Sequence, residues 1–420
     1  MRMDDMILIS IDDHIIEPED MFERQMPERY RDEAPKYVRA DNGLDHWEFQ
    51  GFSTGSVGLN AVASWPHEEW GMDPVGHAEM RPGCYRPDLR VRDMDANGVL
   101  ASMCFPTFAG FNGMSLARST IDRELTKVIV SAYNDWHIDE LAGEHPGRFV
   151  PLAIVPVFDP EGMAAEVRRV AAKGCHAITL PETPYGVDLP SYDDAEYWGP
   201  VFDACTESDV AICLHIGGSF GLLKRPPQAS IDHLIVLAPQ LSAVTATDLM
   251  LSGTFIRHPE LRVALSEGGI GWISFLLDRM DRHVWNHKWT GLKITTDDKT
   301  PSELWRSNFL GCFITDPAAL RVTDRIGVDT VAWECDFPHS DSTWPRSPEL
   351  LWGELEGAGI SADDVINKIS WENASRFFRF DPFAHRPRVE STVGALRATA
   401  TDIDVSETPK AEYRRRYAAA

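Results

Sequence analysis

The stretch ISIDDHIIEPED, residues 9–20, continues a short apolar run and then turns abruptly into charged residues. Ile7, Leu8, Ile9 and Ile11 predict a buried β-strand. A strand of that kind usually ends in a turn of Gly, Asn or Ser. This one ends in Asp12, Asp13 and His14, and then Glu17. Charged groups at the tip of a core strand need a reason, and the other predicted strands supply one.

Similar apolar runs recur along the chain, with longer helix-like segments such as residues 125–144 and 160–174 between them. Alternating strands and helices indicate parallel pairing through βαβ units. Eight such units predict a (β/α)8 TIM-like barrel. An open doubly wound sheet is the alternative, but no G-x-G-x-x-G follows the first strand. The predicted strands lie within residues 6–11, 99–107, 149–157, 176–182, 210–218, 261–269, 309–315 and 330–338.

Two regions depart from this repeat. Residues 31–87 form an insertion after the first strand that is rich in Trp, Gly and His, and we expect a small lobe over the barrel mouth. Residues 386–420 lose the periodicity and predict a C-terminal arm or tail. The metal-dependent barrel domain itself is expected to span residues 1–385.

Composition narrows the function. The net charge of -25 argues against nucleic acid and against an anionic membrane surface as partners. The seven cysteines are scattered without a C-x-x-C pair, and we see no secretory signal or membrane-length apolar run. We therefore expect a cytoplasmic enzyme, a homo-oligomer and specifically a dimer, with a small-molecule substrate.

The predicted strand ends share chemistry. In a parallel barrel the carboxyl ends of all strands surround one site. An isolated Asp is commonly a helix cap, an isolated His a core residue, and an isolated Glu a loop acid. Together, however, they form a carboxylate cluster without Lys or Arg, which a divalent metal ion would neutralise. The residues concerned are Asp12, His14, His215, Glu267 and Asp336, followed by His339 and Asp341.

Four motifs, IDDHIIEP, CLHIGG, LSEGGIGWISFLLDRMD and WECDFPHSDSTWP, resemble the amidohydrolase-related (amidohydrolase 2) family. The resemblance is to its aminocarboxymuconate semialdehyde decarboxylase-like branch and covers residues 7–381. It implies a distorted barrel with a metal held by Asp12, His14, His215 and Asp336. Zinc is the family's usual ion, and the added carboxylates make iron or manganese plausible.

The departures from the family pattern affect the chemistry. Family decarboxylases usually carry a His at the end of the sixth strand, where this chain has Glu267. The fourth strand lacks the bridging Lys of binuclear superfamily members, and the first motif is Asp-x-His rather than His-x-His. Glu17, Glu267 and His339 would suffice, with the first set, to hold a second ion.

The main functional prediction is a metal-dependent hydrolase or decarboxylase acting on a small organic substrate with a carbonyl or carboxylate. Asp336 would accept a proton, Glu267 or His339 would move protons or orient the substrate, and Arg225 and Asp341 would contact it. The missing sixth-strand His weakens the decarboxylase version. A binding protein on an enzyme scaffold is less favoured, because the ligand set is complete.

A second functional class stays open. With two ions, the chain would be a nonheme diiron monooxygenase of secondary metabolism, acting on an apolar terpenoid-type substrate. The aromatic residues of the insertion would then form an apolar lid, although packing of the insertion's own core explains them more simply. These residues are Trp47, Phe49, Phe52, Trp65 and Trp70.

Overall fold

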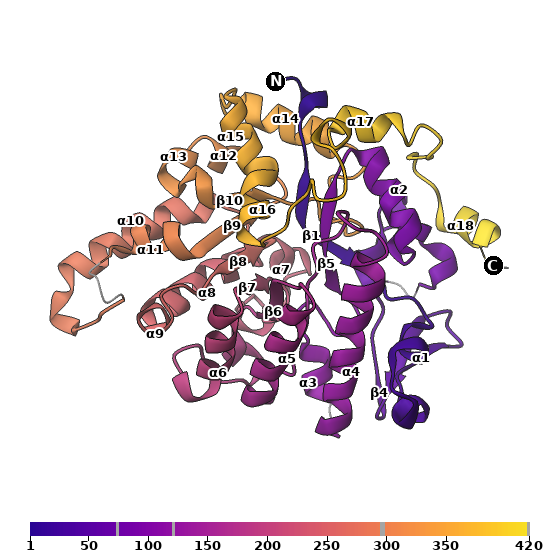
Figure 1. Cartoon of the computed structure of the whole chain (residues 1–420), viewed down its shortest axis with the longest axis horizontal. Helices are drawn as coiled ribbons and strands as arrows, with labels where there is room; N and C mark the ends of the chain where they lie inside the picture. Colours follow the sequence, from indigo (N-terminus) through magenta and orange to yellow (C-terminus); the bar gives the residue numbers. More distant parts are fainter. Residues whose placement is uncertain (73–74, 120–121, 295–298, 418–420) are drawn as a thin grey trace.

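The predicted strands form one barrel in the computed structural model, which describes residues 1–72, 75–119, 122–294 and 299–417 (Figure 1). Seven of them are regular strands that pair in parallel with their neighbours in chain order. The predicted (β/α)8 barrel is therefore confirmed. The strands are β1 (Ile9–Ile15), β5 (Ala101–Pro106), β6 (Ala177–Pro181), β7 (Ala211–His215), β8 (Val263–Ser266), β9 (Phe309–Phe313) and β10 (Val331–Trp333).

The eighth barrel segment, residues 149–157, runs between β5 and β6 but pairs only through isolated bridges. Phe149 bridges to Ser102 on one side, and Ala153 bridges to Ile178 on the other. Pro151 and Pro156 explain the short pairing, because proline has no N–H to donate to a neighbouring strand. The segment still joins the two sheets into one wall.

The barrel closes where β1 meets the segment after β10. The Asp336 N–H donates to the Asp12 carbonyl at 2.8 Å, and the His14 N–H donates to the Phe337 carbonyl at 2.7 Å. The Asp13 side chain adds to this closure, since its carboxylate accepts the Phe337 N–H at 2.8 Å and the Ser102 hydroxyl. The Asp13 side chain thus makes hydrogen bonds on the outer face of β1, and its neighbours Asp12 and His14 face the inside of the barrel.

Helices cover the outside of the barrel, as Figure 1 shows. Several helices have an aspartate as their N-cap. Before α5, for example, the Asp159 side chain accepts the Gly162 N–H, and Pro160 is the first helical residue. The longer helices are α2 (Pro87–Asn97), α4 (Arg123–Asp135), α5 (Pro160–Ala172), α6 (Ala195–Glu207), α8 (Gln240–Leu251), α10 (Gly271–Asn286), α11 (Pro301–Asn308), α14 (Ser347–Gly357) and α18 (Lys410–Tyr417). The shorter ones are α1 (Met21–Gln25), α3 (Met114–Ser119), α7 (Asp232–Leu237), α9 (Thr254–Arg257), α12 (Pro317–Leu320), α13 (Thr323–Ile326), α15 (Asp363–Asn367), α16 (Asn373–Phe377) and α17 (Val393–Ala398).

The insertion contains a small antiparallel sheet of β2 (Lys36–Arg39), β3 (Asp45–Phe49) and β4 (Phe52–Ser53). Trp47 is buried and its ring packs against Phe22 and Phe108 at centroid distances of 5.2 and 5.5 Å. These contacts support the packing explanation for the insertion's aromatics. The insertion also reaches the loop after β10, because the Val62 and Ala63 N–H groups donate to the Pro338 carbonyl.

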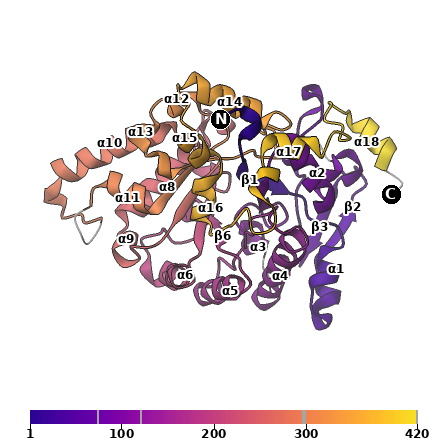
Figure 2. The same ribbon diagram turned by 45° about the horizontal axis from the view of Figure 1, so that its top comes forward.

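The C-terminal residues 386–417 pack along the barrel as an arm. The Val393 N–H donates to the Met6 carbonyl at 2.8 Å, and α17 lies beside α2 (Figure 2). Farther on, the Tyr413 side chain is buried, and its hydroxyl lies 2.6 Å from that of Ser64 in the insertion. The arm therefore ties the insertion to the barrel wall.

One helical stretch, Asp232–Leu251, is long and apolar enough to cross a membrane by composition, with 39% of it buried. It divides into α7 and α8 around Pro239, and α8 buries Leu241, Ala246 and Leu249 in the protein. Helix α8 therefore packs against the protein interior, whereas no residue of α7 is buried.

The closure of the barrel gives a stability prediction. Asp13→Ala leaves the buried Phe337 N–H and Ser102 hydroxyl without their acceptor. We therefore expect the free energy of unfolding to fall by about 2–4 kcal/mol relative to the unaltered protein. Asp13→Asn keeps an acceptor oxygen and should lose clearly less. Urea unfolding of both variants measures this, and an Asp13→Ala change below about 0.5 kcal/mol would show that the closure does not depend on Asp13.

Candidate metal centre

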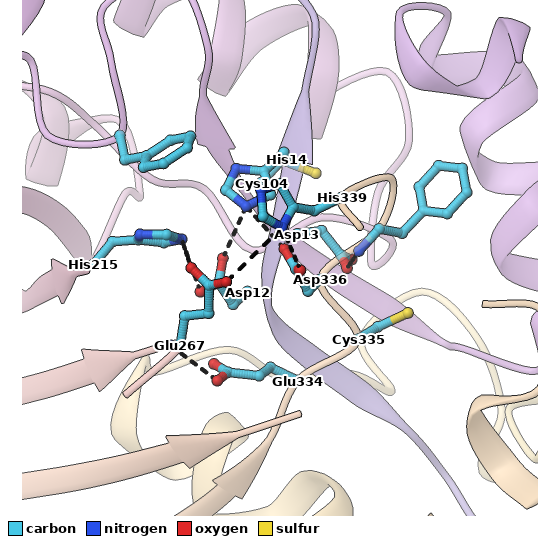
Figure 3. A network of polar contacts seen from close by, with 12 residues as sticks. Asp12, Asp13, His14, Cys104, His215, Glu267, Glu334, Cys335, Asp336 and His339 are labelled. Atoms are coloured by element: carbon cyan, nitrogen blue, oxygen red, sulfur yellow. Dashed lines mark hydrogen bonds and ion pairs between the residues drawn. The ribbon is translucent and has the colours of Figure 1, made fainter. Parts of the chain in front are cut away.

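Three side chains from β1 and β7 meet inside the barrel: Asp12, His14 and His215 (Figure 3). All three side chains are 0% exposed. His215 Nε2 lies 3.2 Å from Asp12 Oδ2, and His14 Nε2 lies 4.0 Å from Asp12 Oδ1. Asp12 and His14 share the inward face because they are two apart on one strand. The structure therefore brings these three predicted ligands together.

A second trio, Glu267, Asp336 and His339, adjoins the first. Asp336 lies between the two, with Oδ1 2.9 Å from His14 Nε2 and Oδ2 3.0 Å from His339 Nδ1. Glu267 Oε2 lies 3.4 Å from His215 Nε2. Six predicted site residues thus converge on one place at the carboxyl ends of the strands, which Figure 3 shows.

The backbone turns sharply at two of these residues. Glu267 has φ +57° and Asp336 has φ +61°, which is the left-handed region that few residues other than glycine adopt. Each residue directly follows a strand or lies within three residues of its end. Strained conformations of this kind cluster at functional sites, where the surrounding structure maintains them.

Glu334 is a buried carboxyl group that the sequence analysis did not identify. It is 0% exposed, and its Oε1 accepts the Glu267 N–H at 2.9 Å, so it holds the backbone of Glu267 in place. Glu334 lies two residues before Asp336, and that spacing at a strand end could have indicated a shared inward face. Figure 3 shows Glu334 beside Glu267 with this hydrogen bond between them.

The centre is rich in buried carboxyl groups. Burial raises the carboxyl pKa of Asp12 and Glu334 well above the usual range, and burial together with Asp336 raises that of Glu267 to about 8. Burial lowers the pKa of His14 to about 4. Within the described residues, the ion pairs of Asp12, Glu267 and Asp336 are with histidines and none is with Lys or Arg.

His339 and Asp336 form an ion pair, with Nδ1 of His339 3.0 Å from Oδ2 of Asp336. Burial would lower the pKa of His339, but the adjacent Asp336 carboxylate raises it to about 10. Burial alone would raise the pKa of Asp336, but His339 and His14 lower it below its usual range. His339 therefore carries a positive charge beside these carboxylates.

The donor set fits a divalent metal ion. Both carboxylate oxygens of Asp12, Nε2 of His14 and His215, and Oδ1 of Asp336 are buried without a hydrogen-bond partner among the described residues. Buried polar atoms are normally paired, so such a convergent set needs a ligand. Imidazole and carboxylate are the ligands of Zn²⁺, Mn²⁺ and Fe²⁺.

Two predicted residues do not join the centre. The Glu17 carboxylate accepts the backbone N–H groups of Thr107 and Phe108 at 2.9 Å, and its contribution to a second ion stays a prediction. Arg225 is exposed and donates to the Ala229 carbonyl at 2.6 Å, away from the cavity described next. A substrate contact through Arg225 is therefore not favoured.

A cavity of about 490 Å³ opens beside the centre. Glu267, His339 and Asp341 line it, so the metal site can be reached from this side, and the substrate contact predicted for Asp341 stays a prediction. Phe111 lies at the boundary, with its ring 4.7 Å from that of His14 and 4.5 Å from that of His215. The ligand atoms are therefore buried, and the site is accessible from the cavity side.

These pKa shifts predict how stability depends on pH in the metal-free protein. Burial raises the pKa of Asp13 and Glu17 to about 7, and burial with Asp336 raises that of Glu267 to about 8. Because these values lie above those of the unfolded chain, the stability that they contribute is present at low pH and is lost as the pH rises through them. The His339 contribution changes in the same direction, through a pKa of about 10.

His14 acts in the opposite sense, with a pKa of about 4, but its contribution is lost only as the pH falls below that of a free histidine. We therefore expect the free energy of unfolding to fall between about pH 6.5 and pH 8.5. Added Mn²⁺ should oppose the fall, because metal ligands bind in their deprotonated form. Urea unfolding with chelator and with Mn²⁺ measures both slopes. Rising stability of the chelated protein across this window would contradict the assignment.

Comparison with known proteins identifies relatives of this arrangement. The chain is 24% identical over 307 residues to 2-amino-3-carboxymuconate-6-semialdehyde decarboxylase of Dictyostelium discoideum, covering 72% of this chain and 79% of the relative. It is 28% identical over 319 residues to the gamma-resorcylate decarboxylase of Polaromonas sp. (strain JS666), covering 70% and 87%.

Two solved structures share the fold. An amidohydrolase of Mycobacterium avium subsp. paratuberculosis K-10 superposes with a TM-score of 0.69 at 21% identity, covering 89% of this chain and 99% of the other. A dihydroxybenzoic acid decarboxylase of Polaromonas sp. JS666, solved with bound manganese and the inhibitor 2-nitroresorcinol, superposes with a TM-score of 0.55 at 21% identity, covering 89% and 96%.

The amidohydrolase family model matches residues 52–380. The match begins after β1, so Asp12 and His14 lie outside it, while His215, Glu267 and Asp336 lie within it. It spans well over half of the 420 residues. The chain is an enzyme and belongs to the amidohydrolase family, in its aminocarboxymuconate semialdehyde decarboxylase-like branch.

Proposed function

We propose that the protein is a metal-dependent carboxy-lyase that removes a carboxyl group, as CO2, from a small organic acid. The observation that carries the proposal is the convergent set of buried ligand atoms that make no hydrogen bond within the described residues, beside an open cavity. The relatives support the choice between hydrolysis and decarboxylation, because both curated relatives described above are decarboxylases.

Asp12, His14, His215 and Asp336 would hold one ion. This set leaves the cavity side free, which is the pattern of a catalytic rather than a structural site. When bound, the ion neutralises the carboxylates and polarises an oxygen of the substrate. Zinc is the family's usual choice, and the carboxylate content also suits manganese or iron.

Glu267 and His339 line the cavity next to this set and would handle the proton. Decarboxylation breaks the bond between the carboxyl carbon and its neighbour, and the electron pair stays on the neighbouring carbon. That carbon then takes a proton, and either Glu267 or His339 can supply it from the cavity wall. Asp336 has one oxygen directed toward His14 and the other toward His339, which fits a ligand better than a free proton acceptor.

The second trio also bears on the two-ion alternative. Glu267, Asp336 and His339 are close enough to hold a second ion, as the sequence analysis considered. The diiron monooxygenase alternative has no counterpart among the relatives described above, and we do not propose it. The homodimeric state and the cytoplasmic location stay predictions.

A pair of variants tests the proposal. His215→Ala removes a buried ligand, so metal occupancy and CO2 release from 2,6-dihydroxybenzoate and related 2-hydroxybenzoic acids should both be lost. Glu267→Gln keeps the ligand set, so metal should remain while CO2 release falls about 10²–10⁴-fold. Metal analysis and a CO2 assay measure both, with His283→Ala on α10 as a control that should change neither.

Three outcomes would contradict the proposal. The first is CO2 release by metal-free His215→Ala protein at the unaltered rate. The second is a Glu267→Gln protein that loses half of two bound ions, which would assign Glu267 to a second metal. The third is O2 consumption without CO2 release by the iron-loaded protein, which would favour an oxygenase.

A further inference from the structure

The walls of the active-site cavity are apolar, although its floor is the charged centre. The cavity of about 490 Å³ is lined by polar or charged groups mainly where Glu267, His339 and Asp341 lie. Elsewhere, apart from Asn60, Thr315 and Ser340, its lining is apolar and comes from the insertion, the barrel loops and the α7 region. The apolar lining residues are Val57, Leu59, Met72, Phe111, Ile216, Ile231, Leu234, Ile235, Ala238, Pro239 and Ile314.

Helix α7 and its two cap residues, Ile231 and Ala238, present an apolar stripe to this cavity. Ile231, Leu234, Ile235 and Ala238 follow the i, i+3, i+4, i+7 spacing of one helix face, and all four line the cavity. In a globular protein such a stripe usually packs against the core. Here Ile231 and Ile235 remain 50% and 40% exposed, because their stripe faces the cavity.

Among the described residues that line the cavity, His339 at the metal end is the only basic side chain. Among the residues that line it in the described part of the chain, none is Lys or Arg. A second carboxylate, sulfate or phosphate on the body of a substrate would therefore be unpaired, at a substantial cost in free energy. An acidic group can be accommodated only at the metal end, beside Glu267 and His339.

The size of the cavity adds to this argument. Pockets of about 300–1,000 Å³ take drug-sized ligands, and this cavity lies in that range. A second cavity of about 320 Å³ shares Val57, Asn60, Phe111 and Gly217 with it, which extends the space around Phe111.

From these features, and resting on the proposed function, we infer that the substrate is a monoacid with a bulky apolar body. Its carboxyl group lies at the metal centre, and its body lies against the stripe of α7 and the insertion. One substrate molecule can contact both regions, because the apolar wall, Glu267 and His339 line the same cavity.

A homologous series of ligands tests this inference by binding alone. We would titrate the metal-loaded protein with 2-hydroxybenzoate and with its 4-ethyl, 4-butyl and 4-hexyl derivatives, using calorimetry. Affinity should rise about fourfold for each methylene group that the wall covers. Equal affinities across the series, or weaker binding of the longer acids, would overturn the inference.

Two variants of α7 show where the alkyl chain lies. Ile235→Ala should reduce the gain in affinity of the 4-hexyl acid over 2-hydroxybenzoate by about tenfold. Val236→Ala is the matched control, because Val236 is the next residue along the helix, is 73% exposed and does not line the cavity. Equal losses in the two variants would overturn the placement against α7.

The binding series also separates this inference from the proposed function. An affinity gradient without CO2 release would support the apolar wall and contradict the carboxy-lyase. CO2 release with a flat series would support the carboxy-lyase and overturn the apolar-bodied substrate.

Discussion

Buried negative charge is the constraint on which the rest of this structure depends. Asp12, Glu267, Glu334 and Asp336 lie together inside the barrel, and within the described residues only histidines are their ionic partners. Unpaired charges in a dry interior are costly, so these groups either hold protons or bind a cation. The raised pKa of Asp12, Glu267 and Glu334 is the metal-free protein's response. A divalent ion removes the same cost and adds chemistry.

The closure of the barrel brings these carboxyl groups together, and its hydrogen bonds also hold the structure together around them. The hydrogen bonds between β1 and the segment after β10 bring Asp12 beside Asp336, which are more than 300 residues apart in sequence. Asp13 fastens the other face of β1, and the fully buried Arg90 donates to the His14 carbonyl at 2.6 Å. The charged tip of the first strand therefore has two functions: its inward residues form the site, and its outward residue secures the closure.

Much of this could be predicted from the sequence, for identifiable reasons. Eight apolar runs predicted the barrel, and residues at the strand ends predicted where Asp12, His14, His215, Glu267, Asp336 and His339 converge. The sequence did not show that two backbone N–H groups after β5 bind the carboxylate of Glu17, whose role at a second ion stays a prediction. Glu334 was missed because it lies inside an apolar run. The role of Asp13 in the closure was missed because the direction of its side chain depends on a local irregularity between Ser10 and Asp13. The cavity walls come from separate loops and α7, whose meeting depends on tertiary packing.

The most direct test of the account is the position of the ion. Crystals of the protein loaded with Mn²⁺ would be measured at an X-ray wavelength where manganese scatters anomalously. The account predicts one dominant peak at about 2.0–2.3 Å from ligand atoms of Asp12, His14, His215 and Asp336, with its open side toward the cavity. A centre in which these side chains stay paired with one another while the ion binds elsewhere would contradict it.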